Sequence, residues 1–351
     1  MKGNIKMRLV PVGCLKENTV IAIDVINSDG RILLKRNQRI SKFGIDTLNR
    51  LGVTHVYIRD EFCYNNDDRY TVDLCKFSES IIKLKQIASK VSSGTSGEAD
   101  IKAAYDVARK IVLDLNKYGN DFKIVYEPSK MIVNSLVERC IYVAIMSTAL
   151  GFKMKLRPEQ LIKLCLAALL KDVALFSPKI KAMDENVYYH HPLSGYQHLK
   201  ENYNLDEDIL NAVLHHHELK DGTGFPNKLT GNDICQFARI IGVIDKFYEI
   251  KSSHEMLSGA QDTFESALQS IVKMYDTEVL SYFFKETEIF TLDTLVRLNS
   301  GDIAVIMQNN SSNILRPVIK IIKSNYFRSG EEIELQKYSK LKIESIVYYV
   351  D

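Results

Sequence analysis

The sequence predicts a mainly α-helical protein with a small β-rich module before the helices and a β appendage after them. Apolar residues recur at helical spacing from about residue 130 to residue 286. Short β-branched runs broken by Asn, Ser and Gly follow from residue 289 onward, and a similar pattern precedes residue 62. We therefore expect four units: a β-rich N-terminal module (residues 1–62), a helical spacer (63–125), a helical domain (126–286) and a β appendage (287–351).

Composition and charge exclude several classes of protein. The chain has 46 basic and 44 acidic residues, a formal charge of +2, so it lacks the broad positive surface that DNA requires. Its six cysteines are scattered without a C-x-x-C pair, which is typical of free thiols in a reducing compartment. No run approaches the ~18 uncharged apolar residues that can span a bilayer. We expect a cytoplasmic protein that binds neither DNA nor a membrane.

The N-terminal module has the pattern of a small mixed structure. Two apolar runs, Ile21–Ile26 and Arg31–Leu34, flank an Asp-Gly pair that favours a hairpin turn. Ser41 can cap a short helix that Gly52 ends, and a β-branched strand over Val53–Ile58 follows. No catalytic residue types cluster here, so we interpret the module as structural or regulatory.

The spacer has the pattern of two helices. We expect them over Ser78–Val91 and Ala99–Leu115, joined by the small residues Ser92 to Gly97. Apolar residues of the second helix recur on one face, which predicts packing against a neighbouring element.

The helical domain places polar groups at the ends of apolar helices. We expect helices over Met131–Leu150, over Pro158 to about Lys171-Asp172, over Glu207–His217 and over Cys235–Ile250. His190-His191-Pro192 and the loop Asp221–Pro226 lie between them. This order predicts an all-α bundle with a site facing its core. The appendage that follows has five predicted strands: Val296–Leu298, Asp302–Gln308, Val318–Ile322, Glu332–Leu335 and Ile343–Val350.

Four residues of the helical domain form a candidate metal site. Asp172, His191, His216 and His217 together offer three imidazoles and one carboxylate, a set that suits Zn, Fe or Mn. The alternative is that the histidines are packed or surface residues. Their position beside a Gly-Pro loop favours a site, in which His215 and Glu218 would orient the ligands.

The segment HHHELKDGTGFP, residues 215–226, resembles the HD-GYP signature HHE-x-x-DG-x-GYP. His191-Pro192 resembles the family's HP element, and the run from Ala238 to Asp245 resembles its ligand helix. The resemblance covers about residues 131–286 and implies an HD-type helical bundle, bacterial cyclic di-GMP phosphodiesterase activity and a centre of two or three metals. It implies Asp172 as the catalytic residue and a metal ligand, Asp245 as a further metal ligand, and a substrate-binding loop formed by Asp221, Gly222, Gly224, Phe225 and Pro226.

The chain departs from the family pattern at the site itself. The family's H-D-x-G-K element is represented by Lys171-Asp172-Val173-Ala174-Leu175, so a histidine ligand and a lysine are both replaced. An earlier carboxylate and histidine correspond to Ser135 and Arg139. An alignment shifted by one turn would instead make Glu138 a candidate ligand. The R-P-Y element corresponds to a run starting at His254, and GYP is represented by GFP.

These replacements predict one bound divalent ion rather than two or three. The set of Asp172 and three histidines can hold one ion, but a neighbouring ion would have only Asp172 and Asp245 as ligands. We hypothesise that the cations Arg139 and Lys171 occupy that volume and neutralise both carboxylates. The alternative is that both side chains extend outward into solvent.

Three functions follow from the resemblance and its departures. The first is cyclic di-GMP hydrolysis with weakened activity, and the second is binding of cyclic di-GMP or of a signalling protein without catalysis. The third is hydrolysis of another phosphate ester. The sequence leaves open whether the chain forms a homodimer.

Overall fold

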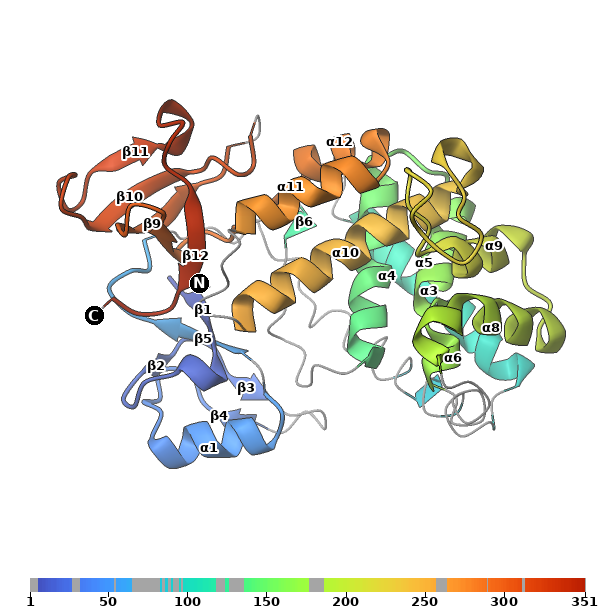
Figure 1. Ribbon diagram of the computed structural model, residues 1–351. Coiled ribbons are helices and arrows are strands. Elements are labelled where there is room, and N and C mark those ends of the chain that lie inside the picture. The colour runs from blue at the N-terminus through green and yellow to red at the C-terminus, as the bar shows by residue number, and fades with distance from the viewer. Residues whose placement is uncertain are drawn as a thin grey trace.

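The computed structural model of the 351-residue chain describes residues 6–26, 32–53, 55–64, 97–117, 124–125, 136–176, 186–256, 264–288, 290–310 and 313–350, with single residues at 83, 86, 87, 90 and 95. A bundle of helices forms one end of the molecule, and two small β units lie at the other end (Figure 1). Among these described residues, no helix has both the length and the apolar character needed to cross a membrane.

The N-terminal module is a small sheet covered by one helix. Its strand order is β1-β5-β2, with β1 antiparallel to β5 and β5 antiparallel to β2. The bounds are β1 (Arg8–Pro11), η1 (Val12–Cys14), β2 (Val20–Ile21), β3 (Val25–Ile26), β4 (Ile32–Leu34), α1 (Lys42–Arg50) and β5 (His55–Arg59). The predicted cap is confirmed, because the Ser41 hydroxyl accepts from the Gly44 N–H at 3.2 Å. β3 and β4 form the predicted antiparallel hairpin, whose turn at residues 27–31 lies outside the described part.

One of the two spacer helices is described. α3 (Glu98–Lys117) confirms the second predicted helix and buries a face that includes Ile101, Ala108 and Ile111. The helix predicted over residues 78–91 falls almost entirely outside the described residues. Contacts of α3 with α5 (Pro158–Leu170) attach it to the bundle.

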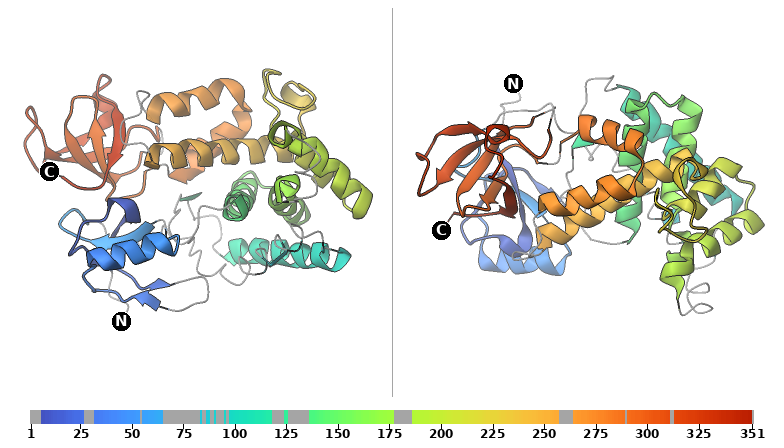
Figure 2. Two further views of the ribbon diagram at one scale, coloured as in Figure 1. Left: turned by 60° about the horizontal axis from the view of Figure 1, so that its bottom comes forward. Right: turned by 45° about the horizontal axis from the view of Figure 1, so that its top comes forward.

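The helical domain packs around a continuous apolar core. Its bounds beyond α5 are α4 (Leu136–Lys153), α6 (Val173–Phe176), α8 (Val187–Asn202), α9 (Glu207–His215), η5 (Gly231–Asp233), α10 (Gln236–Met256), α11 (Phe264–Met274) and α12 (Thr277–Glu286). α4 packs against α5 and α10, and α9 packs against α5, α8 and α10 (Figure 2). Pro158 opens α5 as predicted. The helix α8 was not predicted, since the pattern around His190-His191-Pro192 has no clear helical period.

The C-terminal appendage is an antiparallel sheet with the order β11-β10-β9-β8-β12. The bounds are β8 (Leu295–Leu298), β9 (Ile303–Gln308), β10 (Val318–Lys323), β11 (Glu332–Glu334), η6 (Leu335–Lys337) and β12 (Ile343–Val347). All five predicted strands are present. A short parallel pair, β6 (Ile124–Val125) with β7 (Thr287–Glu288), lies where the bundle meets the appendage. One apolar face of the sheet continues the core of the bundle, so the two share their interior.

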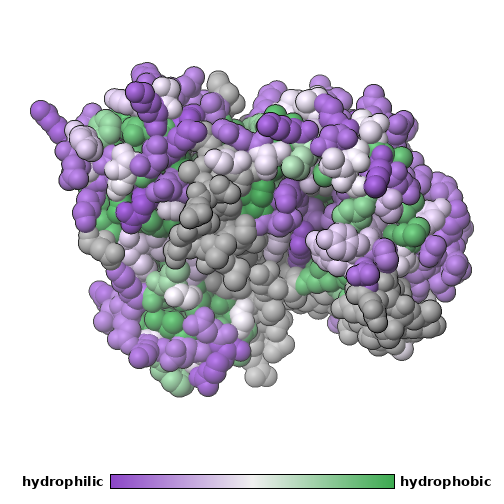
Figure 3. Space-filling model, viewed as in Figure 1, coloured by the Kyte–Doolittle hydropathy of each residue, from purple (hydrophilic) through white to green (hydrophobic). Residues whose placement is uncertain are grey.

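The two β units contact each other through the ends of the chain. Arg8 forms an ion pair with Asp60, and its guanidinium also donates to the Tyr348 carbonyl at 2.7 Å. The Tyr349 ring lies below the same guanidinium at 5.6 Å. The exterior on the side shown in Figure 3 is mostly hydrophilic, with small separate hydrophobic areas.

Candidate metal centre

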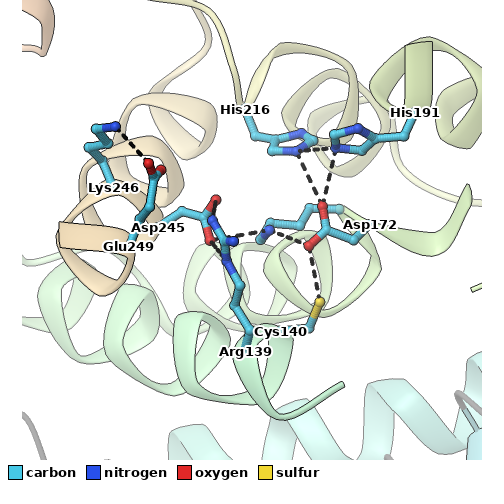
Figure 4. Close-up of polar contacts among 9 residues, drawn as sticks. Arg139, Cys140, Asp172, His191, His216, Asp245, Lys246 and Glu249 are labelled. Carbon is cyan, nitrogen blue, oxygen red and sulfur yellow. Dashed lines mark hydrogen bonds and ion pairs between the residues drawn. The ribbon is translucent and has the colours of Figure 1, made fainter. Parts of the chain in front are cut away.

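Five segments of the bundle bring their polar side chains to one buried place. The side chains of Arg139 and Cys140 come from α4, Asp172 from the end of α5, His191 from α8, His216 from the end of α9, and Asp245 from α10 (Figure 4). Lys171 and His217 come from the same ends of α5 and α9. Asp172 lies in the middle, with dashed contacts to the two labelled histidines on one side and to Cys140 on the other. Residues separated by more than a hundred positions therefore share one site.

The orientation of His191 depends on the proline that follows it. Pro192 lies inside α8 and has no N–H, so the carbonyl four residues earlier, that of Tyr188, lacks its usual helical partner. The His191 Nδ1–H donates to this carbonyl at 2.5 Å. A carbonyl can only accept, so Nδ1 carries a hydrogen, and in the neutral ring the Nε2 lone pair is directed toward the site.

His216 is oriented in the same way by the end of a helix. Its Nδ1–H donates to the Val213 carbonyl at 2.7 Å, in the last turn of α9, where carbonyls have no further helical N–H. Burial lowers the pKa of His216, which favours the neutral ring. Its Nε2 atom therefore also presents a lone pair.

The two histidines and Asp172 converge on one point. The two Nε2 atoms lie 3.2 Å apart. The Asp172 Oδ1 atom lies 3.2 Å from Nε2 of His191 and 3.6 Å from Nε2 of His216. When both rings are neutral and carry their hydrogen on Nδ1, two lone pairs and a carboxylate oxygen face one another. A divalent cation satisfies all three, so these residues fit a metal ion.

His217 completes a set of three imidazoles. One nitrogen from each of His191, His216 and His217 lies within 4.8 Å of the others. Burial lowers the pKa of His217 far below its ordinary value, so the ring is neutral and can act as a ligand. The ring stacks on Phe225 with centroids 4.8 Å apart, which holds it in place.

The two oxygens of Asp172 have different partners. Oδ1 faces the histidines, whereas Oδ2 accepts from the Lys171 ammonium and contacts the Cys140 sulfur at 3.3 Å. Burial alone would raise the pKa of Asp172, but the charge of Lys171 holds it well below its usual range. The carboxylate therefore stays ionised and lies between the candidate ion and an ammonium group.

Asp245 is neutralised entirely by side chains. Arg139 donates to both of its oxygens at 2.9 Å, in the bidentate geometry typical of strong pairs. The Lys171 ammonium lies 3.3 Å from Oδ1 of Asp245, so it bridges the two carboxylates. The ion pairs hypothesised from the sequence are present, and the alternative of Lys171 extending into solvent is wrong, because its side chain is 1% exposed.

The charges of these four ionised side chains balance before any metal ion is bound. Asp172 and Asp245 contribute two negative charges, and Lys171 and Arg139 contribute two positive charges. Burial by itself lowers the pKa of Lys171, but the two carboxylates outweigh it and the net pKa is raised, so the ammonium group stays protonated. A divalent ion placed beside Asp245 would meet two resident cations.

The loop after α9 is shaped by its glycines and by Glu218. Gly222 has φ +77°, and a Cβ on Gly224 would lie 2.3 Å from the Leu219 nitrogen, so a side chain is excluded there. The Glu218 carboxylate accepts from the backbone N–H groups of Asn227 at 2.6 Å and Leu229 at 2.9 Å. The expectation that Glu218 orients the histidines is wrong, since it holds the loop instead.

Other predicted site residues have varied positions. Asp221 is exposed and its carboxylate accepts from the Thr223 N–H and hydroxyl, while Pro226 follows Phe225 through a cis peptide bond. Leu175 is partly buried in α6. Ser135 lies outside the described residues, as do the side chains of Glu138 and His254.

Two features of the site had no clear signal in the sequence. In the sequence, Cys140 is one of six scattered cysteines, and its contact with Asp172 arises only from the packing of the helices. The pair Tyr188-Tyr189 reads as ordinary aromatic residues, although Tyr188 supplies the carbonyl that orients His191. The Pro192 imino group was the one available signal, because it predicts an unpaired carbonyl four residues earlier.

Comparison with known proteins finds two matching families and two similar curated proteins. Residues 127–279 match a family described as an HD domain, and residues 295–348 match a KOW domain associated with the HD domain. A cyclic di-GMP phosphodiesterase of Pseudomonas aeruginosa, PA4108, is 30% identical over 140 residues, which are 38% of this chain and 33% of that protein. The cyclic di-GMP phosphodiesterase PdeB of Borreliella burgdorferi is 30% identical over 230 residues, which are 61% of this chain and 58% of that protein.

A solved structure is also similar at low identity. It is that of Bd1817, described as a HDG"Y"P protein from Bdellovibrio bacteriovorus, with a TM-score of 0.46 and 17% sequence identity over 79% of this chain and 97% of that chain. Of the two curated relatives, the matched part of this chain spans about a third of PA4108 and somewhat more than half of PdeB.

Proposed function

We propose that the chain is an HD-GYP-type member of the HD-domain proteins, that it binds cyclic di-GMP at a centre with one divalent ion, and that it hydrolyses the dinucleotide slowly. Fe, Mn and Zn all suit the ligand set of three imidazoles and one carboxylate. The proposed ligands are Asp172, His191, His216 and His217. Both curated relatives are named cyclic di-GMP phosphodiesterases, which supports this choice of substrate.

The observation that carries the proposal is the convergence of donor atoms. Nε2 of His191 and of His216 lie 3.2 Å apart, and Asp172 Oδ1 lies within 3.6 Å of both. A divalent ion at this place would supply Lewis acidity to a phosphodiester. The chain's own contribution is to keep the rings of His216 and His217 neutral and one carboxylate ionised, and to fix the rings of His191 and His216 through backbone carbonyls.

Slow hydrolysis follows from the cations on the other side of Asp172. Two-metal phosphodiester cleavage uses two ions about 3.5–4 Å apart. Here the ammonium of Lys171 and the guanidinium of Arg139 neutralise Asp172 and Asp245. We propose that these two cations occupy the place of a second ion. Unlike a metal, neither group can generate a nucleophile from water by strong polarisation, and Leu175 offers no charge to a phosphate.

The same observations favour a second candidate function, binding without turnover. A site that holds one ion and two fixed side-chain cations can still attract an anionic phosphodiester. Binding of the dinucleotide would then be reported to a signalling partner. The described cysteines are free thiols, which suits the cytoplasmic location proposed for either function.

The test combines metal analysis with product analysis. Protein purified without chelators is analysed for Fe, Mn and Zn, and then incubated with Mn²⁺ or Fe²⁺ and cyclic di-GMP while linear pGpG and GMP are measured. We expect about one tightly held ion per chain, binding of the dinucleotide and slow product formation. Binding without product selects the second function. Two or more tightly held ions per chain, or no binding, would refute the proposal.

A reconstruction variant tests why hydrolysis is slow. The combination Arg139→His, Lys171→His and Leu175→Lys removes both resident cations from the carboxylates and restores the residue types of the family pattern. We expect a second metal ion and faster hydrolysis. The matched control is Lys153→His, which replaces a buried ion-paired lysine of the same bundle away from the site. No gain in metal content would contradict the role given to Lys171 and Arg139.

A further inference from the structure

Two consecutive tyrosines beside the histidines are both exposed. Tyr188 is 57% exposed and Tyr189 is 63% exposed, and both are in the first turn of α8. Large aromatic side chains gain free energy from burial, so exposing two neighbours is unfavourable unless something covers them. Neither ring contributes to the apolar core of the bundle.

The two rings adjoin the candidate metal centre directly. The Tyr188 ring lies 5.8 Å from the ring of His191 and 6.5 Å from that of His217. The Tyr189 ring lies 5.8 Å from Phe225, which in turn stacks on His217. The rings of Tyr188, Tyr189 and Phe225 thus form an aromatic surface that begins at the metal ligands and extends outward.

The position of Tyr188 is fixed by the same contact that orients a ligand. Its carbonyl accepts from the His191 Nδ1–H, so the backbone carrying its ring is part of the frame of the site. The Tyr189 ring meets the Tyr188 ring edge to face at 88°. Two aromatic faces with different directions are therefore held beside the ion-binding atoms.

Resting on the proposed function, we infer that Tyr188 and Tyr189 form a stacking subsite for a purine base of the cyclic dinucleotide. A base is joined to its phosphate through one sugar, so a phosphate at the histidines places the base over the adjoining rings. Stacking of a base on an aromatic side chain contributes about 1–3 kcal/mol and needs no charged partner. A Tyr–Tyr face beside a metal centre thus selects phosphodiesters that carry bases.

The experiment measures binding of cyclic di-GMP to the full chain loaded with Mn²⁺. A contribution of about 1–3 kcal/mol corresponds to a roughly 5-fold to 150-fold weaker affinity for Tyr188→Leu and Tyr189→Leu. Tyr188→Phe and Tyr189→Phe keep the aromatic face and should bind nearly as well as the natural chain. Tyr326→Leu is the matched control, because Tyr326 is 82% exposed in the loop between β10 and β11 of the C-terminal appendage, and its replacement should leave affinity unchanged.

A spectroscopic readout separates stacking from a general effect on the fold. A cyclic dinucleotide carrying 2-aminopurine should lose fluorescence on binding to the natural chain and to the Phe variants, and keep it with the Leu variants. Metal content should be the same in all variants, because no ligand atom changes.

The possible failures point to different errors. If the natural chain binds no cyclic dinucleotide, both the proposed function and the subsite are overturned. If it binds and the Leu variants bind equally well, only the subsite is overturned. Leu variants that change the oligomeric state without changing the affinity would show that this surface contacts a second copy of the chain instead, which also overturns the inference.

Discussion

Replacing Lys171 with methionine removes the ammonium group that bridges two buried carboxylates while nearly keeping the volume of the side chain. The Lys171 side chain is 1% exposed, and those of Asp172 and Asp245 are 4% and 6% exposed. At 3.3 Å, the distance between Lys171 and Asp245, two unit charges interact by about 5 kcal/mol with an effective dielectric constant of about 20. Breaking a buried pair by removing one partner costs about 3–5 kcal/mol, and we expect a loss of that size.

The assay is guanidinium unfolding in the presence of a chelator, so that no divalent ion can replace the ammonium group. Lys337→Met is the control. Lys337 pairs with Glu334 at 2.7 Å, but the two side chains are 67% and 54% exposed, and exposed pairs contribute only about 0–1 kcal/mol. Two lysines with similarly short contacts should therefore differ several-fold in their effect on the free energy of unfolding.

A second arm of the experiment adds Mn²⁺. In Lys171→Met, a divalent ion can bind between Asp172 and Asp245, so the variant should recover part of its lost stability and gain metal content. The natural chain should gain stability from one ion alone. A loss below about 1 kcal/mol in the chelator would refute the reasoning that Lys171 neutralises both carboxylates.

Two further predictions concern the frame of the site and the packing of the bundle. Pro192→Ala supplies an N–H that competes with His191 for the Tyr188 carbonyl, so the His191 ring should lose its fixed orientation. Metal affinity should then fall about 10-fold to 100-fold while the helix is retained. Unchanged metal affinity by calorimetry would contradict this prediction. Asp276 caps α12 and pairs with Arg239 at 2.8 Å; burial alone would raise its pKa, but the backbone N–H of Val279 and Arg239 hold it below the ordinary value of 3.8. Its stabilising contribution is therefore present above about pH 4 and lost as the pH falls through the folded-state pKa. Asp276→Ala should lower the free energy of unfolding by about 1–2 kcal/mol at pH 7, and this loss should shrink toward pH 3 in unfolding titrations. A loss that does not depend on pH would contradict the prediction.

Much of the fold was predictable because its signals are local. The helix over α5 begins at Pro158 and the helix α1 is capped by Ser41, and both follow from residues within one turn. The strands of the appendage follow from β-branched runs between turn residues. By contrast, α8 was missed because its helical period is interrupted at Pro192, and its formation depends on packing against α6 and α9.

The amino-acid sequence by itself determined which residue types are available at the site: three histidines, Asp172, and cations where a family ligand is expected. These residue types can be recognised from the sequence because their spacing along the chain is set by local residue order. Only the tertiary structure decided that Oδ1 of Asp172 faces the histidines while Oδ2 faces Lys171, and that Arg139 reaches Asp245 across 106 positions. These pairings depend on how whole helices pack, and the energy that selects a packing is shared among many apolar contacts rather than encoded next to the residues that meet.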